Sequence, residues 1–337
     1  MKKMKLTVLA LSMLAASGAV LAKEKIRVAD SLPVNHFIAE ALIKPWMEEV
    51  KTMSNGDIVF QYFPAEQLAK EKDMFELVRS GGADVAYFVP SYTPEKFPLS
   101  VVGEIPGTNK TPCEATMAYW ELTKEGGFLD EQELSKQGVS MLLPLSLAAY
   151  QIQTTKRPAD SLKAFNGLQI RTAGDMKELA LSKLGATPVS MTATEIRDAM
   201  ARGTVDGSAL SFSSVPPYGI EEVAKYSTDN FDLGTVALGY YFNRDKWNSF
   251  SDAHKKIMND AAAKVVPLGC QMIIDLSNKD KQKMVDAGVE MVQFAESDQP
   301  KLNEILGSVQ EEWAASVEKA GKPGKKALEL YLEALQK

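Results

Sequence analysis

The chain has 337 residues, of which 45% are hydrophobic and 24% are charged, and its formal net charge is −6. This size and composition allow one or two large cores, and the acidic balance argues against nucleic acid and anionic lipid as partners. Residues 1–22 combine three lysines, an apolar run and a small-residue end, which predicts a secretory signal peptide. We expect an exported chain that begins at Lys23, with 35 basic against 44 acidic residues, a net charge of −9 and no stable membrane insertion.

The first half of the exported chain alternates apolar runs with helical patterns. The apolar pattern of residues 37–53 predicts a helix, which Pro45 should kink or split. Alternation and turn residues predict strands at 26–29, 57–63, 84–89, 139–145 and 150–154, and helices at 70–79 and 111–124. We therefore expect a mixed α/β fold.

Residues 167–207 form the most regular stretch of the chain. A strand at 168–171 leads to a helix between Asp175 and Gly185, and a second strand at 188–191 leads to a capping box formed by Thr192 and Glu195. Another helix and a third strand follow. Such a unit closes most easily as right-handed crossovers on a parallel sheet, which binds ligands at the carboxyl ends of its strands. Arg171 lies at one of those ends.

The last third contains one very long helical pattern. Residues 251–287 are helical in character and broken only around Pro267, so this helix can span two lobes. The remaining patterns are strands at 208–214, 236–242 and 289–294, a helical turn at 221–226, and helices at 299–319 and 325–336.

The sequence offers little for catalysis or metal binding. Its two histidines, His36 and His254, form no zinc cluster, and there is no nucleophile elbow. The two cysteines, Cys113 and Cys270, lie far apart, and we interpret both as buried small side chains rather than as a disulfide. We expect no metal and no cofactor, although a carboxylate-pair enzyme stays open as an alternative.

Several segments together resemble the TRAP-type periplasmic solute-binding proteins of the dicarboxylate-binding class. They are residues 167–171, 184–189, 191–195 and 203–207, with weaker matches at Gly56, 63–68, Asp84 and 243–247. The resemblance implies a two-lobed α/β fold with a ligand cleft between the lobes and a long helix that supports both. It also implies a monomeric periplasmic receptor, not an enzyme, that delivers an organic acid to a sodium-driven membrane permease. A ligand-sensing partner of a membrane receptor is the alternative with the same fold.

The expected organisation is a signal peptide and two discontinuous lobes. After residues 1–22, the first lobe takes 23–147 plus about 235–270, and the second takes 148–234 plus about 271–337. The resemblance places the carboxylate-binding arginine at Arg171, whose planar fork of donors suits a carboxylate. Gln151 falls where relatives that bind sialic acid have a second arginine, which suggests a single strong anionic contact.

Other candidate ligand contacts are aromatic and polar residues at predicted strand ends and in the loops after them. They are Phe88, Tyr92, Phe212, Tyr241, Ser31 and His36. A cleft with one guanidinium and aromatic walls favours a monocarboxylate with a flat or apolar body, because unpaired charges and hydroxyls are costly to bury. We expect a 2-oxo acid, a 2-hydroxy acid or an aromatic acid.

Overall fold

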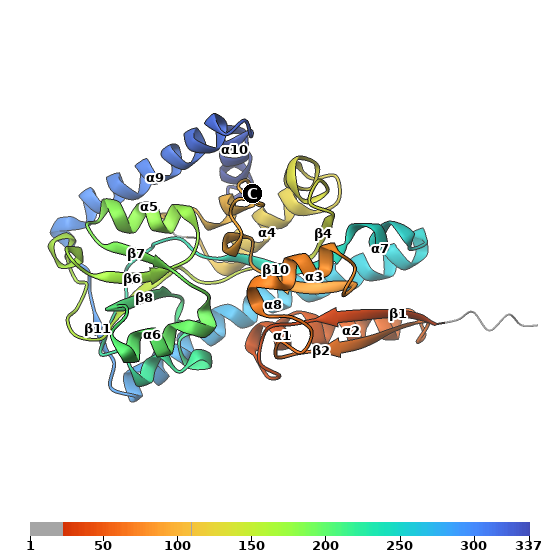
Figure 1. The fold of residues 1–337 in the computed structure, drawn as a ribbon, viewed down its shortest axis with the longest axis horizontal. Helices are drawn as coiled ribbons and strands as arrows, with labels where there is room; N and C mark the ends of the chain where they lie inside the picture. The colour runs from red at the N-terminus through yellow and green to blue at the C-terminus, as the bar shows by residue number, and fades with distance from the viewer. Residues whose placement is uncertain (1–22, 109) are drawn as a thin grey trace, which may run out of the picture.

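The computed structural model describes residues 23–108 and 110–337, and the expected signal peptide lies outside them. The two-lobed α/β fold expected from the sequence is confirmed: each lobe is built on its own β-sheet, and the lobes lie side by side along the longest axis (Figure 1). Among the described helices, none is both long and apolar enough to cross a membrane.

The sheet of the first lobe has five strands in the order β2-β1-β3-β10-β4. Their bounds are Glu24–Ala29 for β1, Ile58–Phe63 for β2, Val85–Phe88 for β3, Val139–Ser146 for β4 and Ala237–Asn243 for β10. β1 is parallel to β2 and β3, whereas β10 is antiparallel to both of its neighbours. Strand β10 therefore joins this sheet from a part of the chain that is distant in sequence.

Short helices pack around this first sheet. They are α1 (Phe37–Ala41), α2 (Ile43–Met53), α3 (Met74–Arg79), α4 (Pro112–Thr123) and α7 (Arg244–Ser249). The predicted helix at 37–53 is split, but at Leu42 (φ −122°, ψ −75°) rather than at Pro45. Pro45 lies in the first turn of α2, where its missing N–H leaves no hydrogen bond unmade.

The sheet of the second lobe has six strands in the order β11-β9-β5-β8-β6-β7. Their bounds are Gln151–Thr154 for β5, Gln169–Thr172 for β6, Thr187–Ser190 for β7, Gly207–Leu210 for β8, Tyr226–Thr228 for β9 and Glu290–Val292 for β11. β6 is parallel to β7 and β8, with α5 (Asp175–Lys183) and α6 (Ile196–Arg202) between them in sequence, so the unit predicted at 167–207 is confirmed. The Thr192–Glu195 capping box is also present.

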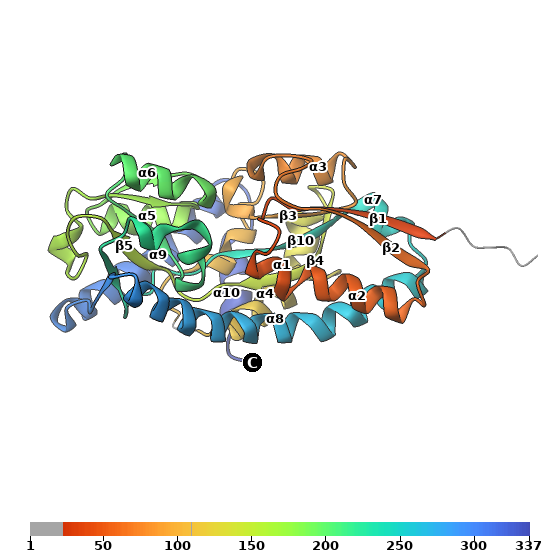
Figure 2. The same cartoon turned by 90° about the horizontal axis from the view of Figure 1, so that it is seen from below.

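Helix α8 (Asp252–Asp286) runs along both lobes (Figure 2). The expected break at Pro267 is wrong, since the helix continues through it. Close packing at Gly269 accompanies this continuity: a Cβ there would lie 2.9 Å from the Ala41 carbonyl oxygen. The indole of Trp46 donates to the Met258 carbonyl at 3.0 Å and ties α2 to the same helix.

Cys113 and Cys270 form a disulfide, so their interpretation as two separate buried side chains is wrong. Cys113 lies near the start of α4 and Cys270 near the middle of α8, and these helices pack side by side. The bond closes a loop across a sequence separation of 157 residues. It fixes α8 to the first lobe.

The C-terminal helices α9 (Gln299–Lys319) and α10 (Gly324–Ala334) contact both halves of the molecule. α9 packs on α5 of the second lobe, whereas α10 packs on α4 of the first. We propose that the chain crosses between the lobes after β4, before β10 and along α8, near the boundaries expected from the sequence, and that both lobes share the C-terminal segment.

Candidate ligand-binding cleft

Arg171 is fixed at the carboxyl end of β6. It is 1% exposed, and its neighbours across the sheet are Val189 of β7 and Ser208 of β8. Its Nε and Nη2 atoms donate to the Met191 carbonyl oxygen at 2.9 and 2.6 Å. These two hydrogen bonds to one carbonyl oxygen fix the plane of the guanidinium.

Tyr92 reaches Arg171 from the opposite lobe. It ends the short helix η2 (Pro90–Tyr92) that follows β3, and its hydroxyl accepts a hydrogen bond from the Ala193 amide at 3.2 Å. The Arg171 side chain also lies within hydrogen-bonding reach of this hydroxyl. The two lobes therefore touch at Arg171, as in a closed cleft.

Glu71 is an acidic group of the opposite lobe that lies near enough to Arg171 for their charges to interact. It begins the short helix η1 (Glu71–Asp73) of the first lobe, is 5% exposed, and its Oε2 atom has no hydrogen-bond partner among the described residues. Burial raises the pKa of Glu71 to about 7, and the nearby charge of Arg171 opposes that rise. A hollow of about 260 Å³ separates the lobes here, lined by Glu66, Lys70, Glu71 and Lys72 from one side and Thr192, Thr194 and Glu195 from the other.

Three more tyrosines lie near the pair, of which Tyr87 and Tyr150 are buried and Tyr218 is partly buried. Tyr87 lies on β3, Tyr150 precedes β5, and Tyr218 ends the short helix η8 (Pro216–Tyr218). Burial raises the pKa of all three, with smaller effects from Glu71 and Tyr92 on each, so their hydroxyls are neutral at physiological pH. Neutral hydroxyls can both donate and accept hydrogen bonds, which suits a polar ligand.

A buried ion pair joins the lobes next to Arg171. The Lys177 ammonium of α5 contacts the carboxylate of Glu104, at the end of the short helix η3 (Ser100–Glu104), and donates to the Thr235 carbonyl at 2.9 Å. Gly174 makes this approach possible: its φ is +90°, and a Cβ there would lie 3.1 Å from Glu104 Oε2. The positive charge of Lys177 is thus already paired.

His36 and Ser31, both expected near the cleft, follow β1. His36 Nδ1 accepts from the Ile38 amide at 3.3 Å and caps α1, and its ring lies 5.5 Å from that of Tyr218. Burial lowers the pKa of His36 to about 3, so the imidazole is neutral. Ser31 Oγ has no hydrogen-bond partner among the described residues. Ligand contact by His36 and Ser31 stays a prediction.

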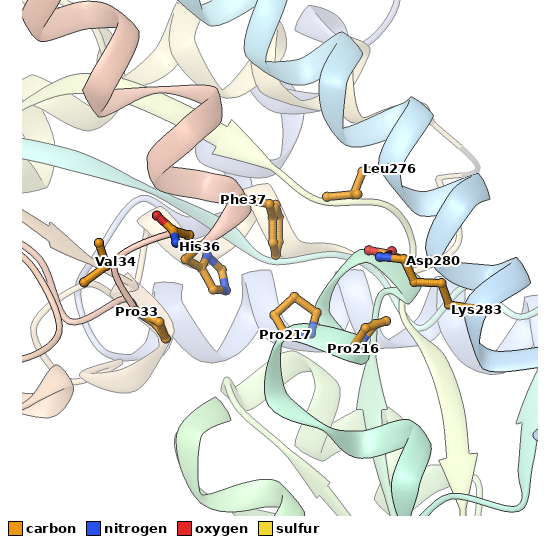
Figure 3. A pocket seen from close by; sticks show the side chains of 10 residues that line it. Pro33, Val34, His36, Phe37, Pro216, Pro217, Leu276, Asp280 and Lys283 are labelled. Atoms are coloured by element: carbon orange, nitrogen blue, oxygen red, sulfur yellow. Dashed lines mark ion pairs between the residues drawn. The ribbon is translucent and has the colours of Figure 1, made fainter. Parts of the chain in front are cut away.

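A second hollow, of about 550 Å³, opens beside His36. Figure 3 shows His36 and Phe37 of the first lobe facing Pro216 and Pro217 of the second. Leu276, Asp280 and Lys283 of α8 line its other side, and Lys283 is paired with Asp280 at 2.6 Å. This hollow is a further place where the two lobes meet.

Sequence comparison decides the family. The model of the bacterial extracellular solute-binding proteins of family 7 matches residues 28–316. The chain belongs to this family. The resemblance to TRAP-type solute-binding proteins is thereby confirmed, and the family is one of periplasmic solute receptors.

Relatives of this family 7 protein are distant in sequence but close in fold. It is 28% identical to a solute-binding protein of Albidiferax ferrireducens over 56% of this chain and 55% of that protein, so the matched segment spans about half of that relative. It is 25% identical to the C4-dicarboxylate-binding periplasmic protein DctP of Rhodobacter capsulatus over 80% of each chain. A marine metagenome TRAP solute-binding protein specific for aromatic acid ligands, solved with metahydroxyphenylacetate, has a TM-score of 0.84 at 23% identity and covers 93% of this chain and 99% of its own.

Four of the residues expected at the cleft of this family 7 protein are engaged elsewhere. Phe88 and Tyr241 stack on each other at 3.9 Å inside the first lobe, and the Phe212 ring lies 5.9 Å from the Lys281 ammonium of α8. Gln151 donates to the Phe231 carbonyl and accepts from Thr228 and the Phe231 amide. Since their polar atoms or ring faces are occupied by protein, we propose no ligand contact for these four.

Glu71, Lys177, Glu104 and the three tyrosines were not predicted from the sequence. The sequence held one indication for Tyr87. Side chains alternate along a strand, so Tyr87 and Phe88 lie on opposite faces of β3 and cannot both pack on the same side of the sheet. Nothing local marked Glu71 or Tyr218, since each comes from a short irregular segment.

Proposed function

We propose that this protein is the solute-binding subunit of a TRAP transporter, which captures a monocarboxylate through Arg171 and delivers it to the membrane permease. The observation that carries the proposal is a buried guanidinium at the carboxyl end of a strand, held in one plane and facing the opposite lobe. A planar fork of donors matches a carboxylate with two parallel hydrogen bonds.

The charges in the cleft favour one carboxylate rather than two. Lys177 is the other buried cation beside Arg171, but Glu104 already pairs with it. A second ligand carboxylate would find no free cation among these groups, and an unpaired buried charge is costly. The tyrosine rings around Arg171 supply flat surface and neutral hydroxyls, which suit an aromatic acid or a 2-hydroxy acid.

The first test is a calorimetric panel of benzoate, mandelate, lactate, succinate and glucuronate. We expect benzoate, mandelate or lactate to bind most tightly, and thermal shifts should follow the same order because a ligand of the native state raises the melting temperature. Tightest binding of succinate would contradict a ligand with one carboxylate, and tightest binding of glucuronate, a sugar acid, would contradict a ligand with a flat or apolar body.

Arg171→Lys should weaken binding of the best acid by about 2 kcal/mol or more, roughly thirtyfold. Lysine keeps the charge but cannot donate from two positions to a carboxylate while holding Met191. Calorimetry on the folded variant measures the loss. The matched control is Arg197→Lys, which alters an exposed arginine paired with Glu222 in the same lobe and should leave affinity unchanged. Equal affinities for both variants would remove Arg171 from the site.

Ligand should also shift the protein from open to closed forms. The two lobes touch at Arg171, Lys177 and His36, and a ligand held from both sides favours this closed arrangement. Small-angle X-ray scattering should therefore give a smaller radius of gyration at saturating ligand. Identical scattering with and without ligand would mean that the cleft does not open in solution.

A further inference from the structure

We propose that Glu71 takes up a proton when a carboxylate binds at Arg171, so that the protein captures its acid more tightly as the pH falls. This inference rests on the proposed function, since it requires an anionic ligand beside Arg171. It adds a residue that senses the charge of the ligand from the opposite lobe.

Glu71 lines the hollow between the lobes together with Thr192, the residue after the Met191 carbonyl that Arg171 binds. Glu71 belongs to the first lobe and Arg171 to the second, and each is at least nine-tenths buried. The backbone amide of Glu71 donates to Glu66 Oε1 at 2.9 Å. Glu71 Oε2 has no partner in the described part of the chain, so it is free to donate or accept once the ligand is bound.

Charged and titratable groups face Glu71 from every element packed around it. They are Arg171 on β6, Glu66 before η1, Glu195 at the start of α6, Asp30 after β1, and the hydroxyls of Tyr87, Tyr92, Tyr150 and Tyr218. Among the described residues, Arg171 is the one buried cation near Glu71, since Lys70 and Lys72, which line the same hollow, are exposed and Lys70 pairs with Glu66 at 2.6 Å. Asp30 accepts from Tyr62, Tyr240 and the Leu32 amide, and these bonds satisfy its carboxylate locally.

A count of charges shows why a proton is needed. Without ligand, the positive charge of Arg171 faces the carboxylate of Glu71, and Lys177 is paired with Glu104. An ionised ligand would put two carboxylates against one guanidinium inside a closed, desolvated cleft. Like charges that share a buried site cannot both stay ionised, and one carboxyl takes a proton. The ligand gains more from ionisation because it bonds the guanidinium directly, so Glu71 is the group that is neutralised.

The titration behaviour of Glu71 agrees with this geometry. Its pKa is already raised to about 7 by burial in the closed cleft, and a nearby ligand carboxylate raises it further. The bound form holds a proton that the free form has lost, so the affinity for the acid increases as the pH falls. Above pH 7 the free protein has mostly lost this proton, and the effect is largest there.

The test is calorimetry at pH 8 with the monocarboxylate of the panel that binds most tightly, in phosphate and in Tris. These buffers differ in ionisation enthalpy, so the difference in observed heat gives the protons taken up for each ligand bound. We expect about one proton, and the Kd should rise by up to about tenfold between pH 7 and pH 8. Such monocarboxylates stay ionised throughout this range.

Two variants separate Glu71 from its neighbours. Glu71→Gln mimics the protonated carboxyl, so proton uptake should fall to near zero and the affinity at pH 8 should approach that of the unaltered protein at lower pH. Glu76→Gln is the matched control, because Glu76 lies on α3 of the same lobe, is exposed and pairs with Arg79 outside the hollow. It should leave the proton uptake unchanged.

Each outcome has a distinct meaning. Tight binding with no proton uptake and a flat pH profile would overturn this inference and leave the proposed function intact. Uptake that persists in Glu71→Gln would assign the proton to another group and overturn it as well. If none of the monocarboxylates binds at any pH, the proposed function fails, and this inference fails with it.

Discussion

Replacement of Cys113 and Cys270 by alanine should lower the free energy of unfolding by about 4 kcal/mol. A disulfide stabilises mainly by restricting the unfolded chain, and the effect grows slowly with the length of the closed loop, to roughly 5 kcal/mol for loops above 100 residues. The separation here is 157 residues. Urea denaturation of the oxidised protein and of the double variant would measure the difference.

The single variants make this experiment decisive. If the bond itself stabilises the protein, Cys113→Ala, Cys270→Ala and the double variant should lose nearly the same amount, because the first substitution already breaks the bond. Two independent buried side chains would instead give losses that add. Reduction of the unaltered protein should reproduce the loss, and additive losses would show that the bond does not form in solution.

Lys177→Met should destabilise the closed protein by roughly 3–5 kcal/mol, because it leaves the Glu104 carboxylate buried without its partner. Burial already raises the pKa of Glu104 and lowers that of Lys177, so neither charge is stable there alone. Chemical denaturation at constant pH measures the cost. The combined Glu104→Gln and Lys177→Met variant should recover most of it, since no unpaired charge remains.

The control for this substitution lies on the same helix. Lys183 of α5 pairs with Glu312 of α9 at the surface, and Lys183→Met should cost less than about 1 kcal/mol because exposed pairs are screened by water and salt. Equal losses for Lys177→Met and Lys183→Met would mean that the buried pair is no more important than a surface one.

Local sequence patterns predicted the helices and strands of this fold better than they predicted the tertiary contacts between them. The unit at 167–207 follows from two periodicities, two helix ends and a capping box, all within 41 residues, and it has the predicted parallel pairing. Pro45 and Pro267 misled the prediction for the same reason. Their local effect depends on helix position and on what packs against the helix, and neither can be read from the neighbouring residues.

The residues of the candidate site lie far apart in the sequence, so the contacts between them could not be predicted from it. Arg171 could be proposed because it ends a predicted strand within a motif of the family. Glu71 and Tyr218 come from short 3-10 segments, and only the packing of the two lobes places them near Arg171. Alternation in β3 put Tyr87 and Phe88 on opposite faces but could not say which face turns toward the cleft. The disulfide was missed because α4 and α8 lie side by side despite their distance along the chain.

The path of α8 links the surface of the molecule to the angle between its two lobes. The helix is 35 residues long, about 52 Å, and Cys270 anchors it to the first lobe near its middle. Beyond that anchor it packs on the segment η7 (Phe212–Ser214) of the second lobe. In Figure 2, α8 lies on the side of the molecule opposite α3 and α6, the helices near the 260 Å³ hollow. A change in the angle between the lobes must therefore appear as sliding or bending of the far half of α8. A protein docked on that back surface would sense whether the cleft is shut without touching the acid inside.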